Sequence, residues 1–158
     1  MKIKGRKIDK PNIEIIVIPR GDGESIVFKA QAVLDYEPFR KLCPAPEAPR
    51  RMLPGGVMQE NIEDKDYLLK LGEYQTLRMA WVMLESLKAT EDLEWETIKA
   101  DEPSTWANFT KELEESKFSN AEIQMIVDGV AAANALDEEK IEAARKSFLL
   151  SQVLPQST

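Results

Sequence analysis

The 158-residue sequence has no histidine at all and a single cysteine, Cys43. Without histidine, the chain lacks the side chain that proteins use most often as a general base and as a metal ligand. One thiol excludes an internal disulfide, which needs two. Carboxylates, lysines and tyrosines could still support catalysis, but no constellation of them stands out. We therefore expect no catalytic residue, no metal site and no cofactor, and favour a protein that acts by contacting other proteins.

The sequence also has no long hydrophobic run. Its uninterrupted apolar stretches are far shorter than the ~20 residues that a membrane-spanning helix needs. The basic start of the chain, residues 1–7, is not followed by the apolar stretch of a secretion signal. The hydrophobic content of 43% and the charged content of 31% are near globular averages, which argues against general disorder. We expect a soluble cytoplasmic protein with one domain or one domain plus a small appendage.

Basic residues are scarce outside the N-terminal third. The net charge of -7 combines an excess of four positive charges in residues 1–53 with an excess of eleven negative charges in residues 54–158. An acidic surface repels phosphate, so we expect no nucleic-acid partner. A solvated acidic surface is the simplest interpretation. The alternatives are that the acidic face meets a basic partner, or that copies of the chain associate through their oppositely charged ends.

The N-terminal third has the pattern of a β-hairpin. Residues 13–18 form a short apolar run rich in β-branched side chains, and Gly21-Asp22-Gly23 supplies turn residues. The segment 25–34 then resumes with alternating apolar positions, which are Phe28, Ala30, Ala32 and Leu34. A two-stranded hairpin is only marginally stable alone, so it must pack on helices or pair with another chain.

A short helix and a proline-rich connection follow. Asp35 is placed to cap a helix over residues 36–42. Residues 43–60 then contain four prolines and the Gly55-Gly56 pair. This composition predicts a linker or an extended arm with polyproline character.

The remaining sequence predicts helices, beginning with a long one from Asp64 to about Lys88. Its apolar positions step by three and four residues: Tyr67, Leu68, Leu71, Tyr74, Leu77, Trp81, Leu84 and Leu87. Residues 91–98 show no clear preference for helix or strand. Pro103 suits the first turn of a second helix, with Trp106, Phe109 and Leu113 on one face.

Two further helices complete the expected bundle. Ser119 and Glu122 form a capping box for a helix with Ile123, Ile126, Val127 and Val130 buried. Asn134 falls at the end of that helix, where it suits a C-cap or a left-handed turn. Asp137 is expected to cap a last helix, with Ile141, Ala144, Phe148 and Leu149 facing inward.

These patterns together predict an α+β fold with an N-terminal β-hairpin, a Pro-rich connection and a C-terminal helical bundle. We expect the hairpin and the short helix in residues 1–42 and the linker or arm in 43–60. The helical domain should occupy residues 61–152, and 153–158 should form a fraying tail.

Few residues qualify as functional candidates. Cys43 lies at a predicted helix C-terminus with no histidine to activate it, so a structural role is favoured. The adjacent carboxylates fall in caps and polar faces, where solvent equalises their pKa values. Trp81 lies on the apolar stripe of the long helix and belongs to the core. Trp95, between two glutamates, is the tryptophan most suited to face a partner, and Phe109 and Phe118 are further partner-binding candidates.

Several short blocks lie in a fixed order along the chain. They are residues 26–36 followed by the proline-rich segment, Trp81, Ser86-Leu87, residues 92–95, 103–106, Phe118-Ser119, Glu122-Ile123, residues 133–136 and 144–149. In this order they resemble the small tail assembly chaperones of tailed bacteriophages, from about Ile13 to Leu150. No single block is specific to that family, and the family has no catalytic residues to carry over.

The resemblance implies a function for which no enzyme chemistry is needed. Tail assembly chaperones coat the helical, aggregation-prone tape-measure protein and keep it soluble until the tail-tube protein polymerises around it. A member of this family would form homo-oligomers such as rings or spirals, bind the tape-measure protein and encounter the tail-tube protein. It would work in the host cell cytoplasm and be absent from the mature virion.

Two alternatives stay open at the level of sequence. One is a structural virion component, such as a tail-completion or head–tail connector protein, because these proteins are similarly small and mixed in fold. The other is an acidic inhibitor or host-takeover protein whose C-terminal region imitates nucleic acid.

Overall fold

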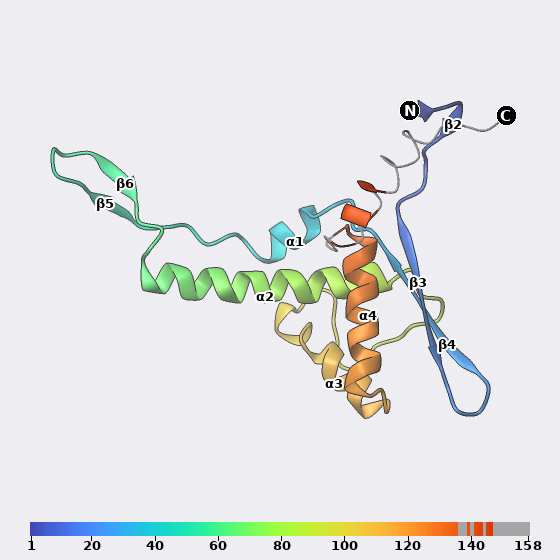
Figure 1. Ribbon diagram of the computed structural model, residues 1–158. Helices are drawn as coiled ribbons and strands as arrows, with labels where there is room; N and C mark the ends of the chain where they lie inside the picture. Colours follow the sequence, from blue (N-terminus) through green and yellow to red (C-terminus); the bar gives the residue numbers. More distant parts are fainter. Residues whose placement is uncertain (136–138, 140, 144, 147–158) are drawn as a thin grey trace. The chain divides into compact units, whose positions relative to one another are not determined.

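The computed structural model describes residues 1–135, 139, 141–143 and 145–146, and its path is shown in Figure 1. It confirms the α+β prediction: small β-hairpins near the N-terminus are followed by helices, one of them long. The chain divides into two compact units. Unit 1 contains residues 1–34, 85–93 and the described part of 118–158, and unit 2 contains residues 35–84 and 94–117.

The predicted hairpin is the centre of unit 1. Strands β3 (Ile13–Pro19) and β4 (Ser25–Gln31) pair antiparallel in the register Ile16↔Phe28. The buried face of this hairpin carries Ile16, Ile18, Phe28 and Ala30. The buried alternation was predicted to continue to Leu34, and that prediction was wrong. The strand ends at Gln31, and Leu34 is 76% exposed.

A second, very small hairpin precedes it. Strands β1 (Lys2–Ile3) and β2 (Arg6–Lys7) pair antiparallel, and Gly5 has a positive φ of 78° in the turn between them. Glycine adopts that conformation without steric cost. Two-residue strands carry no readable alternation, so the sequence did not predict this hairpin.

Helix α4 (Asn120–Ala133) covers the buried face of the β3–β4 hairpin. It begins with the predicted capping box, in which the Ser119 hydroxyl accepts from the Glu122 N–H and the Glu122 carboxylate accepts from the Ser119 N–H. The predicted core positions Ile123, Ile126 and Val130 are buried, whereas Val127 is only half-buried. Helix and strand meet closely at Gly129, because a Cβ at that position would collide with the Ile16 side chain.

Unit 2 is organised by the long helix α2 (Lys65–Leu87), whose last three residues belong to unit 1. The Asp64 carboxylate accepts from the Tyr67 N–H at 2.9 Å, as the predicted cap requires. Helix α1 (Glu37–Leu42) begins one residue later than expected. Tyr36 is its N-cap, and Asp35 instead accepts from the Glu37 N–H at 2.8 Å.

An aromatic cluster forms the core of unit 2. Phe39 of α1 lies with its ring centroid 5.4 Å from Tyr74, 5.5 Å from Trp81 and 6.2 Å from Trp106. These separations are typical of aromatic packing. Phe39, Trp81 and Trp106 are all buried, which confirms the core position predicted for Trp81.

The helix predicted from Pro103 is divided into two pieces. A 3-10 turn, η1 (Pro103–Thr105), precedes α3 (Asn108–Glu115). The division falls at Trp106, whose fully buried indole donates a hydrogen bond to the Lys99 carbonyl at 3.1 Å. This tertiary contact sets the position of Trp106, and the predicted inward residue Leu113 is buried in α3.

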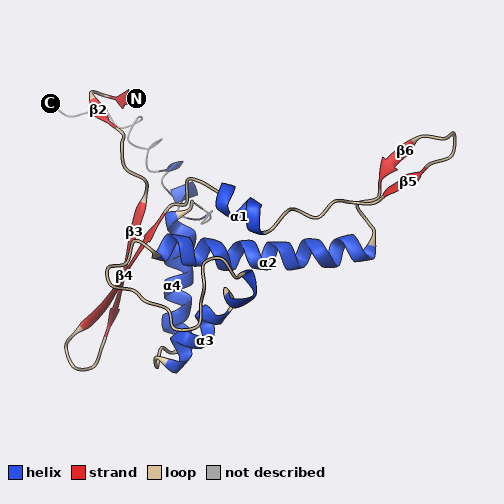
Figure 2. Cartoon of the chain, turned by 180° about the vertical axis from the view of Figure 1, so that it is seen from behind, coloured by secondary structure: helices blue, strands red, loops and turns tan. Residues whose placement is uncertain are grey.

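The proline-rich segment contains a hairpin that the sequence did not predict. Strands β5 (Arg50–Met52) and β6 (Met58–Glu60) pair antiparallel, with Gly55 and Gly56 at φ values of 97° and 79° in the turn. Every strand residue of this hairpin is exposed. We call residues 50–60 the arm. The strands of the described residues pair only two by two, and Figure 2 shows β5 and β6 next to the start of α2.

The last expected helix lies largely beyond the residues that the structure describes. Asp137, Ala144, Phe148 and Leu149 of the last expected helix lie outside the described residues, and Ile141 is exposed rather than buried. Within the described ranges, no helix has both the length and the apolar composition for a bilayer crossing.

Candidate protein-binding surfaces

The three predicted partner-binding aromatics are all half-buried, and they are divided between the units. Trp95 and Phe109 belong to unit 2, and Phe118 belongs to unit 1. Phe118 packs edge-on against Phe28 at 5.7 Å between centroids, and the Arg20 guanidinium lies 4.6 Å from its ring centroid. These contacts give Phe118 a role in holding unit 1 together, alongside any contact with a partner.

The loop that carries Trp95 is held by Glu112 of α3. The Glu112 carboxylate accepts from the backbone N–H groups of Glu96 and Thr97 at 2.8 and 2.7 Å, and from the Thr97 hydroxyl. Partial burial opposes ionisation, but hydrogen bonds from the Thr97 hydroxyl and the nearby backbone keep the pKa of Glu112 below its ordinary value. The sequence pattern did not predict this carboxylate clamp, because its partners lie fifteen and sixteen residues away.

Asn134 is the C-cap of α4, as predicted, and its side chain also bonds to two segments that are distant in sequence. Its side-chain oxygen accepts from the Val33 N–H at 2.9 Å, and its amide group donates to the hydroxyl of the fully buried Ser86 at 2.8 Å. The left-handed residue is its neighbour Ala135, with φ of 55°. Asn134 therefore joins three segments of unit 1, and no local pattern could have indicated the two distant ones.

Cys43 is buried at the C-terminus of α1, as its structural interpretation requires. Desolvation raises the pKa of its thiol, which disfavours the reactive thiolate. A hollow of about 400 Å³ lies beside it, lined by Leu42, Cys43, Pro44, Pro46, Lys70, Glu73, Tyr74, Leu77 and Pro103.

The outer face of the β3–β4 hairpin is apolar and open. The odd-numbered residues Ile13, Ile15 and Val17 of β3 are exposed, as is Val27, which pairs with Val17. Ile15 is 61% exposed. Lys29 and Gln31, which pair with Ile15 and Ile13, lie on the same face. Exposed apolar residues bordered by polar ones are typical of interaction sites.

A groove runs along β3 beside α4. It encloses about 300 Å³ and is lined by Glu14, Ile15, Ile16, Val17, Met125, Asp128 and Gly129. Four consecutive strand residues form one wall, and α4 forms the other. We call it the edge groove. Both of its charged lining residues, Glu14 and Asp128, are acidic.

Between Leu68 and Met79, helix α2 carries a face of exposed uncharged residues, with Lys65 one turn before it on the same side. Leu68, Leu69, Gly72, Thr76 and Met79 lie along this face at helical spacing. Leu69 is 68% exposed, and Leu68 and Met79 are also exposed. Continuing along the same face, Val82 and Met83 are buried. We call the five exposed residues the open face of α2.

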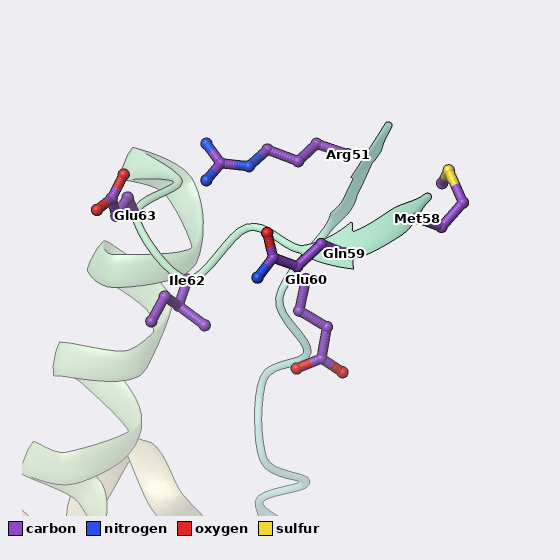
Figure 3. Close-up of a pocket in the computed structure, with 6 residues that line it drawn as sticks. All are labelled: Arg51, Met58, Gln59, Glu60, Ile62 and Glu63. Atoms are coloured by element: carbon purple, nitrogen blue, oxygen red, sulfur yellow. The ribbon is translucent and has the colours of Figure 1, made fainter. Parts of the chain in front are cut away.

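The base of the arm forms a third hollow, of about 580 Å³. Figure 3 shows its lining residues: Arg51, Met58, Gln59, Glu60, Ile62 and Glu63. The Arg51 side chain extends across the hollow in the direction of Glu63. Because every lining residue is exposed, the hollow resembles part of a protein-binding surface more than an enclosed small-molecule site.

The surfaces described above are the candidate binding sites of this chain. In the part of the chain that the structure describes, no three His, Cys, Asp or Glu residues are grouped so that they could hold a metal ion. No protein-family model, no curated protein and no solved structure matches this chain.

Proposed function

We propose that this chain is a non-catalytic bacteriophage tail assembly chaperone that binds the tape-measure protein and keeps it dissolved during tail assembly. The open face of α2 is the single observation that carries the proposal. Leucines and methionines exposed on an ordered helix are unfavourable in water unless a partner covers them.

The open face suits a helical client. The large apolar side chains of Leu68, Leu69 and Met79 flank the smaller Gly72 and Thr76. Space is open around Gly72, because a Cβ there would meet nothing within 4 Å. A client helix can therefore bring its apolar stripe close to α2, in the helix-to-helix mode that amphipathic segments use.

Charge and self-association complete the proposed role. Residues 54–158 carry the excess of acidic groups, which keeps a complex with an apolar client dissolved. A long client needs many copies, so the chaperone would form homo-oligomers along it. It would release the client to the tail-tube protein in the host cytoplasm and would not enter the mature virion.

Co-expression with the cognate tape-measure protein tests the proposal. Wild-type chain should keep the client in the soluble fraction, and the open-face variant L68E/M79E should lose most of this effect, because two carboxylates would then face the client's apolar stripe. The variant S104E/T110E adds two carboxylates at exposed positions of η1 and α3 and should behave like wild type.

Three results would contradict the proposal. The client could be equally soluble without the chain, or L68E/M79E could protect it as well as wild type does. Several copies of the chain in each purified virion, measured by mass spectrometry, would favour a structural connector instead.

A further inference from the structure

We propose that copies of this chain join head to tail, with the β5–β6 arm of one copy seated in the edge groove of the next. The proposal deepens the self-association that the proposed function requires. Its two surfaces, the arm and the edge groove, share no residue with the open face of α2, so the two proposals can be tested with different variants.

The first observation is the free edge of β3. The Ala32 N–H donates to the Asn12 carbonyl at 2.9 Å, and the Arg20 N–H donates to the Glu24 carbonyl at 2.8 Å. Hydrogen-bonded pairs alternate along an antiparallel ladder, so the even-numbered residues of β3 bond to β4. The backbone N–H and C=O groups of Ile13, Ile15 and Val17 consequently point away from β4.

The arm has a matching edge. The Leu53 N–H donates to the Val57 carbonyl at 2.8 Å, and the Asn61 N–H donates to the Pro49 carbonyl at 2.7 Å. By the same alternation, Arg51 bonds to β6, and the backbone groups of Arg50 and Met52 point outward. Among the strands that the structure describes, β3 pairs with β4 alone and β5 with β6 alone.

An unpaired strand edge is a template for pairing with another strand. Adding β5 to β3 would convert two hairpins into one four-stranded sheet, which is the strand-addition mode of recognition. Such a sheet would gain the third and fourth strands that an isolated hairpin lacks.

Charge complementarity selects the occupant of the groove. The α4 wall of the edge groove presents the acidic side chain of Asp128, and no basic residue lines the groove. The arm carries two cations, Arg50 and Arg51, at consecutive positions of β5, so each face of the strand presents one of them, and Glu60 is the one acidic residue of the arm. Apolar surfaces also match, since Met52 of the arm and Ile15 and Met125 of the groove are exposed.

Both halves of this interface belong to every copy, so the occupant is a second copy of the chain. An arm that enters a neighbour's groove makes a heterologous contact, and each copy keeps one arm and one groove for further neighbours. Contacts of this type generate rings when the rotation closes and open helical filaments when it does not. Either assembly could follow a long client.

A charge-swap experiment on the full chain tests the interface. Sedimentation velocity at low salt should show wild type assembling with rising concentration. R50E/R51E makes the arm acidic, and D128R makes the groove basic on one wall. Each variant alone should need roughly tenfold or more protein to assemble, because like charges would then meet in the interface.

Mixing the two variants, or combining their substitutions in one chain, should restore assembly, because each altered surface then meets an opposite charge. R6E/K7E, which makes the same charge change on β2, is the matched control and should assemble like wild type. Circular dichroism should show an unchanged secondary structure in every variant.

Several outcomes would overturn the proposal. These are a monomeric wild type at every concentration, unimpaired assembly of R50E/R51E or of D128R, and a mixture that remains dissociated. Loss of assembly by D128R but not by R50E/R51E would indicate pairing of β3 with β3 instead. The open-face variant L68E/M79E should assemble normally, so failure of the chaperone proposal and failure of this one give different results.

Discussion

The β3–β4 hairpin and the β5–β6 arm have the same strand pairing, but one is partly buried and the other is exposed to solvent. Both are antiparallel pairs with glycine in a left-handed conformation at the turn. The seven-residue strands of β3–β4 have one face buried, with α4 packed against them, whereas the three-residue strands of the arm are exposed on both faces. Strand pairing alone is enough to form either hairpin. Only the β3–β4 hairpin has a buried side, because α4 packs against it.

The largest difference should appear when an apolar side chain is removed from each hairpin. F28A deletes a ring buried in unit 1, which should lower the free energy of unfolding by about 3–5 kcal/mol. M58A removes an exposed side chain from the arm and should change it by less than about 0.5 kcal/mol. Urea denaturation followed by circular dichroism measures both. Equal losses would mean that the arm is packed as tightly as β3–β4.

The close approach of α4 to β3 provides a second test of whether helix packing distinguishes the two hairpins. G129A places a methyl group against the Ile16 side chain, and the overpacking should cost about 1–3 kcal/mol. The control is G72A, at a helical glycine with open space around it, which should stabilise by about 0.5–1 kcal/mol. Thermal unfolding of both variants should move in opposite directions. If G129A is as stable as wild type, the helix and strand do not approach closely there.

The smallest expected effect concerns pH. Hydrogen bonds from the Ser119 backbone and hydroxyl, together with the Arg20 guanidinium at 3.1 Å, hold the pKa of Glu122 below its ordinary value. A carboxyl with a lowered folded-state pKa contributes stability above its unfolded-state pKa, and that contribution is lost as the pH falls through the folded-state value.

Acidification from about pH 6 to about pH 3 should therefore loosen the start of α4 against the β3–β4 hairpin. Two-dimensional NMR of wild type over this pH range should show the amide signals of Ile123 and of residues in the first turn of α4 shifting at the acidic end, because a lowered pKa delays protonation of Glu122. E122Q, which cannot ionise, should have an α4 signal pattern that depends less on pH. An equal pH dependence of the α4 signals in wild type and in E122Q would contradict the assignment of this effect to Glu122.

Local patterns were sufficient where neighbouring residues determine the structure. The capping box at Ser119 and Glu122, the cap at Asp64 and the period-three-and-four spacing of α2 were all predicted, because each depends on residues within one or two helical turns. The interruption at Trp106 was not predicted, since its indole bonds to the Lys99 carbonyl outside the helix.

The candidate surfaces were harder to predict than the elements. Trp95, Phe109 and Phe118 were chosen because aromatic residues are common at interfaces, yet the structure leaves each of them half-buried. The exposed leucines of α2 were instead predicted to be core positions or left unmarked. Amphipathic spacing identifies an apolar stripe, but it does not tell whether another part of the chain covers that stripe.

The sequence by itself determined that this chain is an α+β protein without histidine chemistry, with a strand pair in its N-terminal third and capped helices further along. Those features follow from residue type and short-range spacing. Only the tertiary structure decided which apolar faces are covered. It buried Ile16 under α4 and left Ile15, Leu69 and the arm in solvent, because burial depends on segments that are distant in sequence and close in space.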